Sequence, residues 1–320
     1  MKKVKDFLWK PNMLVEELVD SYANLGFQSI ELAESSKVVM KMKRNGAKIF
    51  LTFTSNMVTS GLRGFFAQLC SMKIPNILVT TSGAIEEDLM KSFGESFELS
   101  SFNADDYALH EKGENRVGNL VIRSESYMEF EDKMTEFLTK IYSNRKSSKD
   151  DPSGPRISTS ELLKEIGLLI DDENSILFQA AKNNIPIYCP GIADSSFGFQ
   201  LFMFQQKNPD FIVDTIQDMN RIVTDLSFDE KKGLISLGGS TSKHYAIFAA
   251  LLSGGFDYAV YMTTSHSTSG SLSGATTQEA KSWGKLKDDA EAATVNGDVT
   301  ITFPLMMTSA LDKMKKEGFI

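Results

Sequence analysis

Three side chains in one short segment could carry out amine chemistry: Glu279, Trp283 and Lys285. A lysine beside buried aromatic surface can lose its proton and then form an imine. An aromatic face with a carboxylate is also how proteins hold an ammonium group. Glu279 and Trp283 are four residues apart, which places them on one helix face. The segment therefore predicts an amine site with Lys285 as nucleophile; the ordinary alternative is a core tryptophan beside a solvated lysine.

Histidine is scarce, with His110, His244 and His266 as its three occurrences. His244 begins an expected helix after a Gly-Gly-Ser turn, so it is a candidate general base, the alternative being a solvated helix residue. We expect His110 to be exposed and give it no role, while His266, in a polar loop, stays open. Histidines so scattered predict no metal site. Cys70 and Cys189 are far apart, and we expect both to be core residues.

The elements that must position these residues follow an alternating pattern. Short apolar runs alternate with helical patterns, which predicts an α/β fold: a Rossmann-like open, mostly parallel sheet flanked by helices. Expected strands cover residues 47–54, 76–81, 185–190, 233–238, 257–264 and 299–303. Expected helices cover residues 61–73, 85–93, 211–226, 243–254 and 304–317, and another opens at 159–163 with Glu161 in its first turn.

We expect one domain over residues 1–320 with a helical N-terminal extension. Residues 1–45 have apolar side chains at helical spacing, so they form a helical entry segment. Residues 144–158 are rich in Ser, Asp, Pro and Gly, which predicts an exposed loop inside the domain.

Small polar residues follow four of the expected strands. They lie at residues 54–56, 81–84, 239–242 and 265–277, where strands lead into helices or loops. In open α/β sheets ligands bind beyond the carboxyl ends of the strands, and helix N-termini there favour phosphate groups. The sequence contains neither GxGxxG nor GxxxxGK[ST], but the four segments together predict a dinucleotide site.

Composition narrows the class of protein. The chain has 320 residues, 42% of them hydrophobic and 24% charged, with a formal net charge of -8. This balance is typical of a globular protein, and its acidity argues against general nucleic-acid binding while suiting cationic ligands. No signal peptide and no apolar run long enough for a membrane span is evident, so we expect a cytoplasmic protein without a membrane partner.

Residues 269–290, SGSLSGATTQEAKSWGKLKDDA, resemble the signature of the deoxyhypusine synthase family, in which the lysine of SWGK carries the imine. Further stretches resemble that family in the same order over nearly the whole chain: FTSNMVTSGLR (53–63), TTSGAIEEDLMK (80–91), GENRVGNLVI (113–122), NNIPIYCPGIADSSFG (183–198), LGGSTSKHYAIF (237–248), DYAVYMTT (257–264) and VTITFPL (299–305).

The resemblance implies NAD-dependent transfer of an aminobutyl group from spermidine, through an imine on Lys285, to a lysine of the translation initiation factor 5A precursor. It implies Lys285 and His244 as catalytic residues and a homotetramer. The implied NAD contacts are Ser55, Asn56, Thr81, Ser82, Gly83, Glu87, Asp194, Gly239, Thr264, Ser265 and Asp298. The implied polyamine contacts are Glu86, Glu87, His244, Gly270, Ser271, Glu279, Trp283 and Lys285.

Four positions depart from the family pattern. Leu272 and Phe199 stand where aspartate is usual, Phe248 where asparagine is usual, and Tyr245 where a second histidine is usual. Each lost charge-assisted hydrogen bond weakens a polycation by roughly 1.5–3 kcal/mol, which indicates a different or less charged amine. The alternatives are a homospermidine synthase-like enzyme acting on small amines, and a catalytically silent NAD-binding regulatory paralogue.

Overall fold

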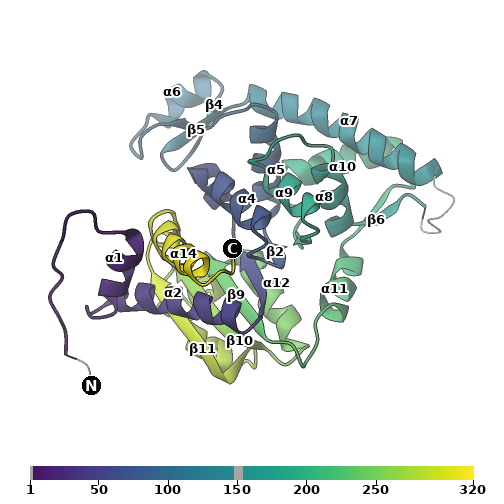
Figure 1. Ribbon diagram of the computed structural model, residues 1–320. Helices are drawn as coiled ribbons and strands as arrows, with labels where there is room; N and C mark the ends of the chain where they lie inside the picture. The colour runs from purple at the N-terminus through teal and green to yellow at the C-terminus, as the bar shows by residue number, and fades with distance from the viewer. Residues whose placement is uncertain (1–2, 148–153) are drawn as a thin grey trace. The chain divides into compact units, whose positions relative to one another are not determined.

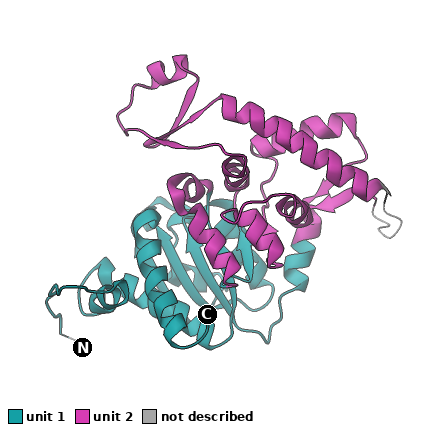
Figure 2. Ribbon diagram, turned by 45° about the horizontal axis from the view of Figure 1, so that its top comes forward, with its two compact units in different colours: residues 1–54, 74–79, 219–320 teal, residues 55–73, 80–218 magenta. Residues whose placement is uncertain are grey.

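The computed structural model describes residues 3–147 and 154–320. Contacts within the chain group these residues into two compact units (Figure 2). Unit 1 comprises residues 1–54, 74–79 and 219–320, and unit 2 comprises residues 55–73 and 80–218. The expectation of one domain stays a prediction, and each unit is described by itself.

Unit 1 is built around parallel strands. Its elements are α1 (Val15–Tyr22), α2 (Gln28–Arg44), β1 (Lys48–Thr52), β2 (Ile77–Val79), β9 (Lys232–Leu237), α12 (Ser240–Leu251), β10 (Phe256–Thr263), η2 (Ser267–Ser269), η3 (Leu272–Gly274), α13 (Thr277–Ser282), β11 (Leu286–Asn296) and α14 (Val299–Lys316). The strands lie in the order β11-β10-β9-β1-β2, and every pairing among them is parallel. This confirms the predicted α/β class and parallel sheet.

Helices cover both faces of these strands. α2 and α14 lie side by side over one face, and α12 lies on the other (Figure 1). β9 is accordingly buried along its whole length. A Cβ on Gly233 of β9 would come within 2.7 Å of the Met42 side chain on α2, so this glycine allows the helix to pack closely.

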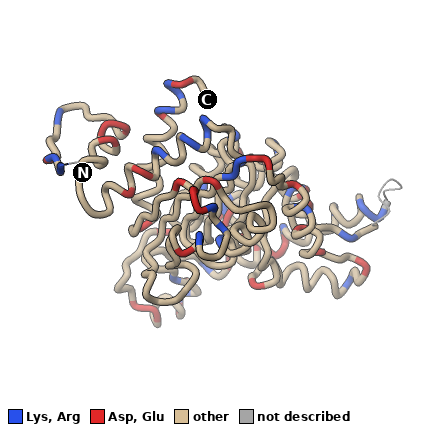
Figure 3. The backbone as a smooth tube through the Cα atoms, turned by 90° about the horizontal axis from the view of Figure 1, so that it is seen from below, with Lys and Arg blue, Asp and Glu red and all other residues tan. Residues whose placement is uncertain are grey.

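The C-terminal helix α14 is joined to both N-terminal helices. Lys313 pairs with Asp20 of α1 at 2.5 Å, Lys316 pairs with Glu16 of α1, and Arg44 of α2 pairs with Glu317. Figure 3 shows acidic and basic residues interspersed along this part of the chain. The expected helical entry segment thus contains two helices, of which α2 packs on the sheet and α1 packs on α2 and α14.

The elements of unit 2 are α3 (Ser55–Met57), η1 (Val58–Leu62), α4 (Arg63–Ser71), α5 (Ser82–Ser92), β3 (Glu98–Leu99), α6 (Asp106–Glu111), β4 (Glu114–Val117), β5 (Leu120–Arg123), α7 (Glu125–Ser147), β6 (Arg156–Ser158), α8 (Thr159–Gly167), α9 (Ile176–Lys182), β7 (Ile187–Tyr188), α10 (Ser196–Lys207) and β8 (Ile212–Asp214). α11 (Thr215–Thr224) crosses the division between the units. Strands β3, β5 and β4 form an antiparallel sheet, and β6 pairs with β8 in parallel. The expected helix at 159–163 is confirmed, with a capping box between Ser158 and Glu161.

Residues 299–303, expected as a strand, form the first turns of α14. The alternation VTITF resembles a strand, but Asp298 caps the helix by accepting hydrogen bonds from Thr300. Buried side chains then continue at helical spacing: Val299, Phe303, Met306, Met307, Ala310 and Met314. The cap and this apolar face outweigh the strand propensity of the β-branched residues.

Three further expectations need correction. The expected loop at 144–158 contains the end of α7 and strand β6, and residues 148–153 lie outside the described part. The expected helix at 211–226 begins at Thr215, after strand β8. Strand β11 was missed, because acidic and lysine residues separate its buried positions, which are Leu286, Ala290, Ala293 and Val295. No helix in the described part of the chain combines the length and apolar character that a membrane span requires.

Candidate active site

The carboxyl ends of four neighbouring strands in unit 1, β10, β9, β1 and β2, point to one edge because the strands are parallel. These are the strands after which the sequence predicts dinucleotide-binding segments. In unit 1, Gly239 follows β9, Thr264 and Ser265 follow β10, and Asp298 follows β11. The structure therefore brings these four predicted cofactor contacts to one edge of the sheet.

Helix α12 begins at this edge with little room around it. Gly239 is its N-cap, so no side chain of the cap residue bonds the first amides. A Cβ on Gly239 would lie 2.2 Å from Ser273 Oγ, and the Ser240 N–H donates to that Oγ at 3.1 Å. Only glycine permits this approach of the 272–275 turn, whose Ser273 hydroxyl accepts a hydrogen bond from the first amide of α12.

The backbone of Lys285 is held by a helix-ending turn. α13 ends at Ser282, Trp283 is its C-cap, and Gly284 has φ +66°. The Gly284 N–H donates to Lys281 O at 2.9 Å and the Lys285 N–H to Ala280 O at 3.1 Å. This is a Schellman motif, which explains why glycine separates the tryptophan from the lysine.

Lys285 O accepts a hydrogen bond from the Phe256 N–H at 3.0 Å, at the start of β10. The backbone of Lys285 therefore lies at the amino ends of β10 and β11, the edge opposite the predicted cofactor segments. From the order of the sequence, Lys285 was expected beside the glycine-rich loop at residues 265–277. The intervening helix α13 carries the chain back along the sheet before Lys285 is reached.

The side chain of Lys285 has the surroundings expected of a lysine nucleophile. It is half-buried, and its Nζ lies 4.8 Å from the centroid of the Trp283 ring. Burial lowers the pKa of Lys285 below its usual 10.5. The positive charge of Lys285 also helps to lower the pKa of both His244 and Lys243 on α12. The Lys285 amine therefore acts electrostatically on two residues of that helix.

His244 and Glu279 are both exposed, so each side chain is accessible to a substrate. His244 is exposed on α12, its ring stacks on Phe248 with centroids 6.1 Å apart, and its pKa is lowered, chiefly by desolvation. Glu279 is exposed on α13 and its N–H is capped by Thr276. Glu279 lies within α13, whereas Trp283 is the C-cap residue that follows the last residue of this helix. The two residues were expected on one helix face, but Trp283 is outside the helix.

In unit 2, predicted cofactor contacts gather where α3 and α5 begin. The Ser55 N–H donates to Thr81 Oγ1 at 3.1 Å, and Thr81 is the N-cap of α5 without a capping side-chain bond. A Cβ on Gly83 would lie 2.9 Å from Ser55 Cβ. Ser82 Oγ is 2.5 Å from Ser195 Oγ. The structure thus places Ser55, Thr81, Ser82 and Gly83 together, with Asn56 exposed beside them on α3.

Two carboxylates on α5 are mostly buried. Burial raises the pKa of Glu87 to about 7, and its Oε2 accepts a hydrogen bond from Thr59 Oγ1 at 2.6 Å. Burial also raises the pKa of Glu86, whose Oε2 accepts the Phe197 N–H at 3.2 Å. Glu86 therefore serves the N-terminus of α10, a structural role besides the polyamine contact that the resemblance implies.

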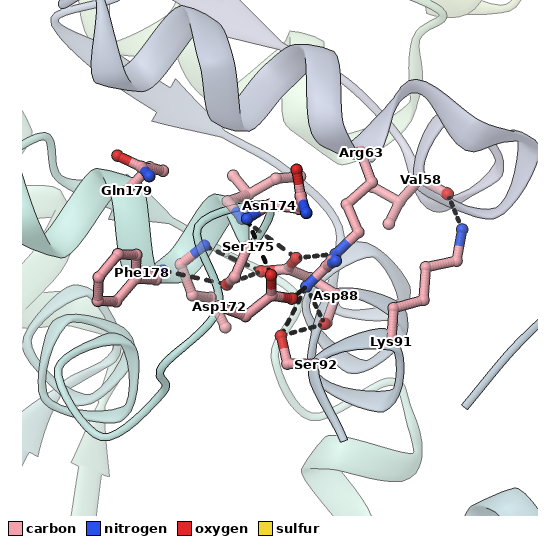
Figure 4. A network of polar contacts seen from close by, with 12 residues as sticks. Val58, Arg63, Asp88, Lys91, Ser92, Asp172, Asn174, Ser175, Phe178 and Gln179 are labelled. Atoms are coloured by element: carbon pink, nitrogen blue, oxygen red, sulfur yellow. Dashed lines mark hydrogen bonds and ion pairs between the residues drawn. The ribbon is translucent and has the colours of Figure 1, made fainter. Parts of the chain in front are cut away.

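Helix α5 is anchored by a network around Asp88 (Figure 4). Asp88 is 1% exposed and pairs with Arg63 at 2.6 Å, and Arg63 also pairs with Asp172 at 2.6 Å. Asp88 accepts the N–H groups of Ile176 and Leu177 at 3.1 and 2.9 Å, which caps α9. One carboxylate thus fixes α4, α5 and α9, and with them the position of Glu86 and Glu87.

The sequence profile of the deoxyhypusine synthase family matches residues 17–310. The chain belongs to the deoxyhypusine synthase family. It is 38% identical over 313 residues to a protein named "Probable deoxyhypusine synthase" from Thermoplasma volcanium, which covers 97% of each chain. It is 34% identical to a protein of the same name from Schizosaccharomyces pombe, over 95% of this chain and 89% of the other.

A solved structure supports the same assignment. The crystal structure of a deoxyhypusine synthase candidate from Entamoeba histolytica matches with a TM-score of 0.64 and 27% identity, and covers 97% of each chain. Membership of the deoxyhypusine synthase family supports a transferase that moves an aminobutyl group from spermidine.

The remaining family-implied residues have mixed settings. Asp194 is exposed before α10, and Asp298 uses its side chain to cap α14. Gly270 has φ +69°, and Ser271 caps η3 by accepting the Ser273 N–H. His110 and His266 are both exposed. Cys70 and Cys189 are free and buried, as expected of core residues.

Phe199, at a position where the deoxyhypusine synthase pattern usually has aspartate, lies 54% exposed on α10. It lines a pocket of about 450 Å³ within unit 2. The lining residues are Tyr127, Met128, Phe130, Glu131, Ser195, Ser196, Phe199 and Gln200. Four of these eight side chains are aromatic or apolar, and Glu131 is the single carboxylate among them.

Sequence reasoning missed Lys243. This lysine is 1% exposed, and its Nζ lies 4.0 Å from the centroid of the Tyr261 ring. Burial lowers the pKa of Lys243 to about 8. Lys243 precedes His244 in the sequence, and the apolar residues that follow are the one local sign that this helix is buried on one side.

We expect Glu87→Gln to change how stability depends on pH. The folded-state pKa of Glu87, about 7, lies above its ordinary value of 4.5, so the folded state binds the proton more tightly. Wild-type stability should therefore fall as pH rises from about 4.5 to about 7, by at most about 3 kcal/mol from this group. Urea unfolding at pH 5 and pH 8 should show a smaller fall in the variant.

The matched control is Glu111→Gln, at an exposed glutamate at the end of α6. Its pH dependence should follow the wild type. An unchanged pH dependence in Glu87→Gln would contradict the burial of a protonated carboxyl at this position.

Proposed function

We propose that this protein is an NAD-dependent aminobutyl transferase in which Lys285 carries the aminobutyl group as an imine. The observation that carries the proposal is the setting of Lys285, which is half-buried against Trp283 with a lowered pKa. A neutral amine is required for attack on an imine carbon, and desolvation favours that form.

Residues present in each unit fit a dinucleotide. In unit 1, Gly239, Thr264 and Ser265 lie at the carboxyl edge of the sheet, beside the N-terminus of α12, which has no side-chain cap from Gly239. In unit 2, Gly83 and the uncapped Thr81 open α5 in the same way. Backbone amides at such N-termini bind phosphate oxygens. NAD, when bound, would supply an acceptor for the hydride of the amine donor and return it at the end.

The residues of this chain have the following proposed parts. Glu279 and the face of Trp283 hold the ammonium end of the donor. The Lys285 nitrogen adds to the imine carbon, and the amine already bonded there leaves, so one amine is exchanged for another. His244, whose pKa is below its usual value, is neutral near pH 7 and takes the proton released by the attacking nitrogen.

The acceptor we propose is a lysine of the translation initiation factor 5A precursor, and the assembly a cytoplasmic homotetramer. Support comes from membership of the deoxyhypusine synthase family and from the match over 97% of the length of the Thermoplasma volcanium protein. The acceptor amine then adds to the imine carbon, and the Lys285 nitrogen leaves it. This second exchange restores the free lysine.

A homospermidine synthase-like reaction on small amines is the second candidate. The observation in its favour is the lack of a carboxylate at Leu272 and Phe199, with Phe199 in a pocket that has a single carboxylate among its lining residues. A silent NAD-binding regulatory paralogue is the third reading, and the retained Lys285, His244 and Glu279 weigh against it.

One experiment separates these candidates. The protein is incubated with NAD and each candidate amine, reduced with borohydride, digested and analysed by mass spectrometry. We expect an aminobutyl mass gain on Lys285 that requires NAD. Transfer to the factor 5A precursor supports the first candidate, transfer to small amines alone supports the second, and no adduct with any amine supports the third.

Gly239→Ala should weaken NAD binding. Its Cβ would lie 2.2 Å from Ser273 Oγ and 2.5 Å from Ser273 Cα, so the turn must move away from the start of α12. We expect the Kd for NAD, measured by isothermal titration calorimetry, to rise at least about tenfold. Gly26→Ala is the control, because no atom lies within 4 Å of its added Cβ. An equal Kd for NAD in both variants would show that the start of α12 is not part of the NAD site.

A further inference from the structure

One face of helix α5 packs against α3 and η1, the two short helices with which unit 2 begins. A Cβ on Gly83 would lie 2.9 Å from Ser55 Cβ. One turn later, Glu87 Oε2 accepts a hydrogen bond from Thr59 Oγ1 at 2.6 Å. Residues four apart in a helix share a face, so the next residue of α5 on this side is Lys91. The family resemblance implies Gly83 and Glu87 as cofactor contacts, but it gives Lys91 no role.

Lys91 binds the backbone of η1 directly. Its Nζ donates hydrogen bonds to Val58 O at 2.6 Å and to Thr59 O at 3.2 Å. The centroid of the Phe97 ring lies 5.1 Å from the same nitrogen. The side chain is half-buried, and burial lowers the pKa of its ammonium group. A methionine of similar length would fill this space without desolvating a charge, so the position uses the hydrogen-bond donors of lysine.

The backbone that Lys91 binds is irregular. η1 is a π-helix, and Gly61 inside it has φ +107° and ψ 5°, which lies outside the helical region. Short π-helical turns of this kind occur frequently at functional sites. Because the helix is interrupted there, the position of α3 and η1 depends on contacts from outside. Beyond the interruption, Arg63 pairs with Asp88 of α5 at 2.6 Å, so Lys91 acts on the part before Gly61.

The part before Gly61 contains two of the NAD contacts that the family resemblance implies, Ser55 and Asn56. Thr59 Oγ1 lies 3.0 Å from Ser55 O, which is a second acceptor for this hydroxyl. Hydrogen bonds therefore connect Lys91 through Thr59 to Ser55 within one turn of backbone. Loss of the Lys91 donors should loosen the backbone that carries both NAD contacts.

We propose that Lys91 is a positioning residue for NAD: its two hydrogen bonds to η1 fix Ser55 and Asn56 beside the start of α5 before the dinucleotide binds. This inference rests on the proposed NAD dependence of the protein. A segment that is ordered in advance loses less conformational entropy on binding, which raises the affinity. Bound NAD orders the same segment through its own contacts, so the reaction that follows depends little on Lys91.

Wild type, Lys91→Met and Lys91→Arg are compared by hydrogen–deuterium exchange without NAD and by isothermal titration calorimetry with NAD. Methionine removes the donors, whereas arginine can donate to both carbonyl groups. In Lys91→Met, we expect the amides of residues 55–62 to exchange at least about fivefold faster. The Kd for NAD should rise at least about fivefold, while the yield of the borohydride-trapped Lys285 adduct at saturating NAD matches the wild type. Lys91→Arg should follow the wild type in all three measurements.

Lys182→Met is the matched control in unit 2. Lys182 Nζ also lies beside a ring, 5.0 Å from the Phe178 centroid, but it pairs with the exposed Glu173. The control should leave the exchange of residues 55–62 and the Kd for NAD unchanged. Unchanged exchange or an unchanged Kd in folded Lys91→Met would overturn the inference, as would an Arg variant that behaves like Met or an adduct yield that stays low at saturating NAD. A wild type that binds no NAD would defeat the proposed function together with the inference.

Discussion

Lys285→Arg is expected to abolish aminobutyl transfer, with a loss of at least roughly 10³-fold, as for removal of a covalent nucleophile elsewhere. Arginine keeps the positive charge but cannot lose its proton to attack an imine carbon. The half-buried setting against Trp283 should still accept the guanidinium group, so the variant should fold. Transfer of label from radioactive spermidine, and borohydride trapping, measure the loss.

Lys287→Arg is the matched control, two residues further along. Lys287 pairs with Asp257 at 2.7 Å, and arginine can keep this ion pair. The control should retain both transfer and the trapped adduct on Lys285. Trapping on another lysine in Lys285→Arg would show that the nucleophile had been assigned to the wrong residue.

Asp88→Ala should destabilise the protein by about 3–5 kcal/mol, because it removes the more deeply buried of the two carboxylates that pair with the buried Arg63. It also removes the acceptor for the first amides of α9 and for Ser175 Oγ, which lies 2.9 Å away. Urea unfolding followed by circular dichroism measures the change in the free energy of unfolding. A loss of this size would identify the network of Figure 4 as the main polar anchor of α5.

Asp210→Ala provides the comparison. Asp210 also pairs with a basic residue, Lys146 at 3.3 Å, but at the surface. Its removal should leave the free energy of unfolding nearly unchanged, since exposed ion pairs are screened by solvent. Similar effects of the two substitutions would argue that Asp88 is not the centre of the network.

The sequence predicted those elements whose local residue pattern agrees with their position in the fold. Strands β1, β9 and β10 are continuous apolar runs, and their parallel pairing follows from the helices between them. The secondary structure of β11 and of residues 299–303 was not predicted, because their local composition favours a different structure from the one that their surroundings in the fold impose. Acidic residues in β11 lie at its exposed positions, whereas the β-branched start of α14 is governed by the Asp298 cap.

The candidate site was foretold mainly by residue type. Lys285 and Trp283 were identified from an amine-binding combination and from the family resemblance, and the structure places Lys285 Nζ 4.8 Å from the ring centroid. The burial of Lys243 and the raised pKa of Glu87 could not be foretold, because both depend on what packs around a side chain from distant segments. Such surroundings are set by the fold and leave no local pattern.

The turn at Gly284 has a consequence for the order of events. Hydrogen bonds on both sides tether the Lys285 main chain, one to the end of α13 and one to the start of β10. A group bonded to Lys285 Nζ can therefore move only as far as the four-carbon side chain of this lysine allows. On the proposed mechanism, donor and acceptor therefore react at the same position in turn, and the product of the first half-reaction must leave before the acceptor binds. Initial rates measured against both substrates should then give parallel lines in a double-reciprocal plot.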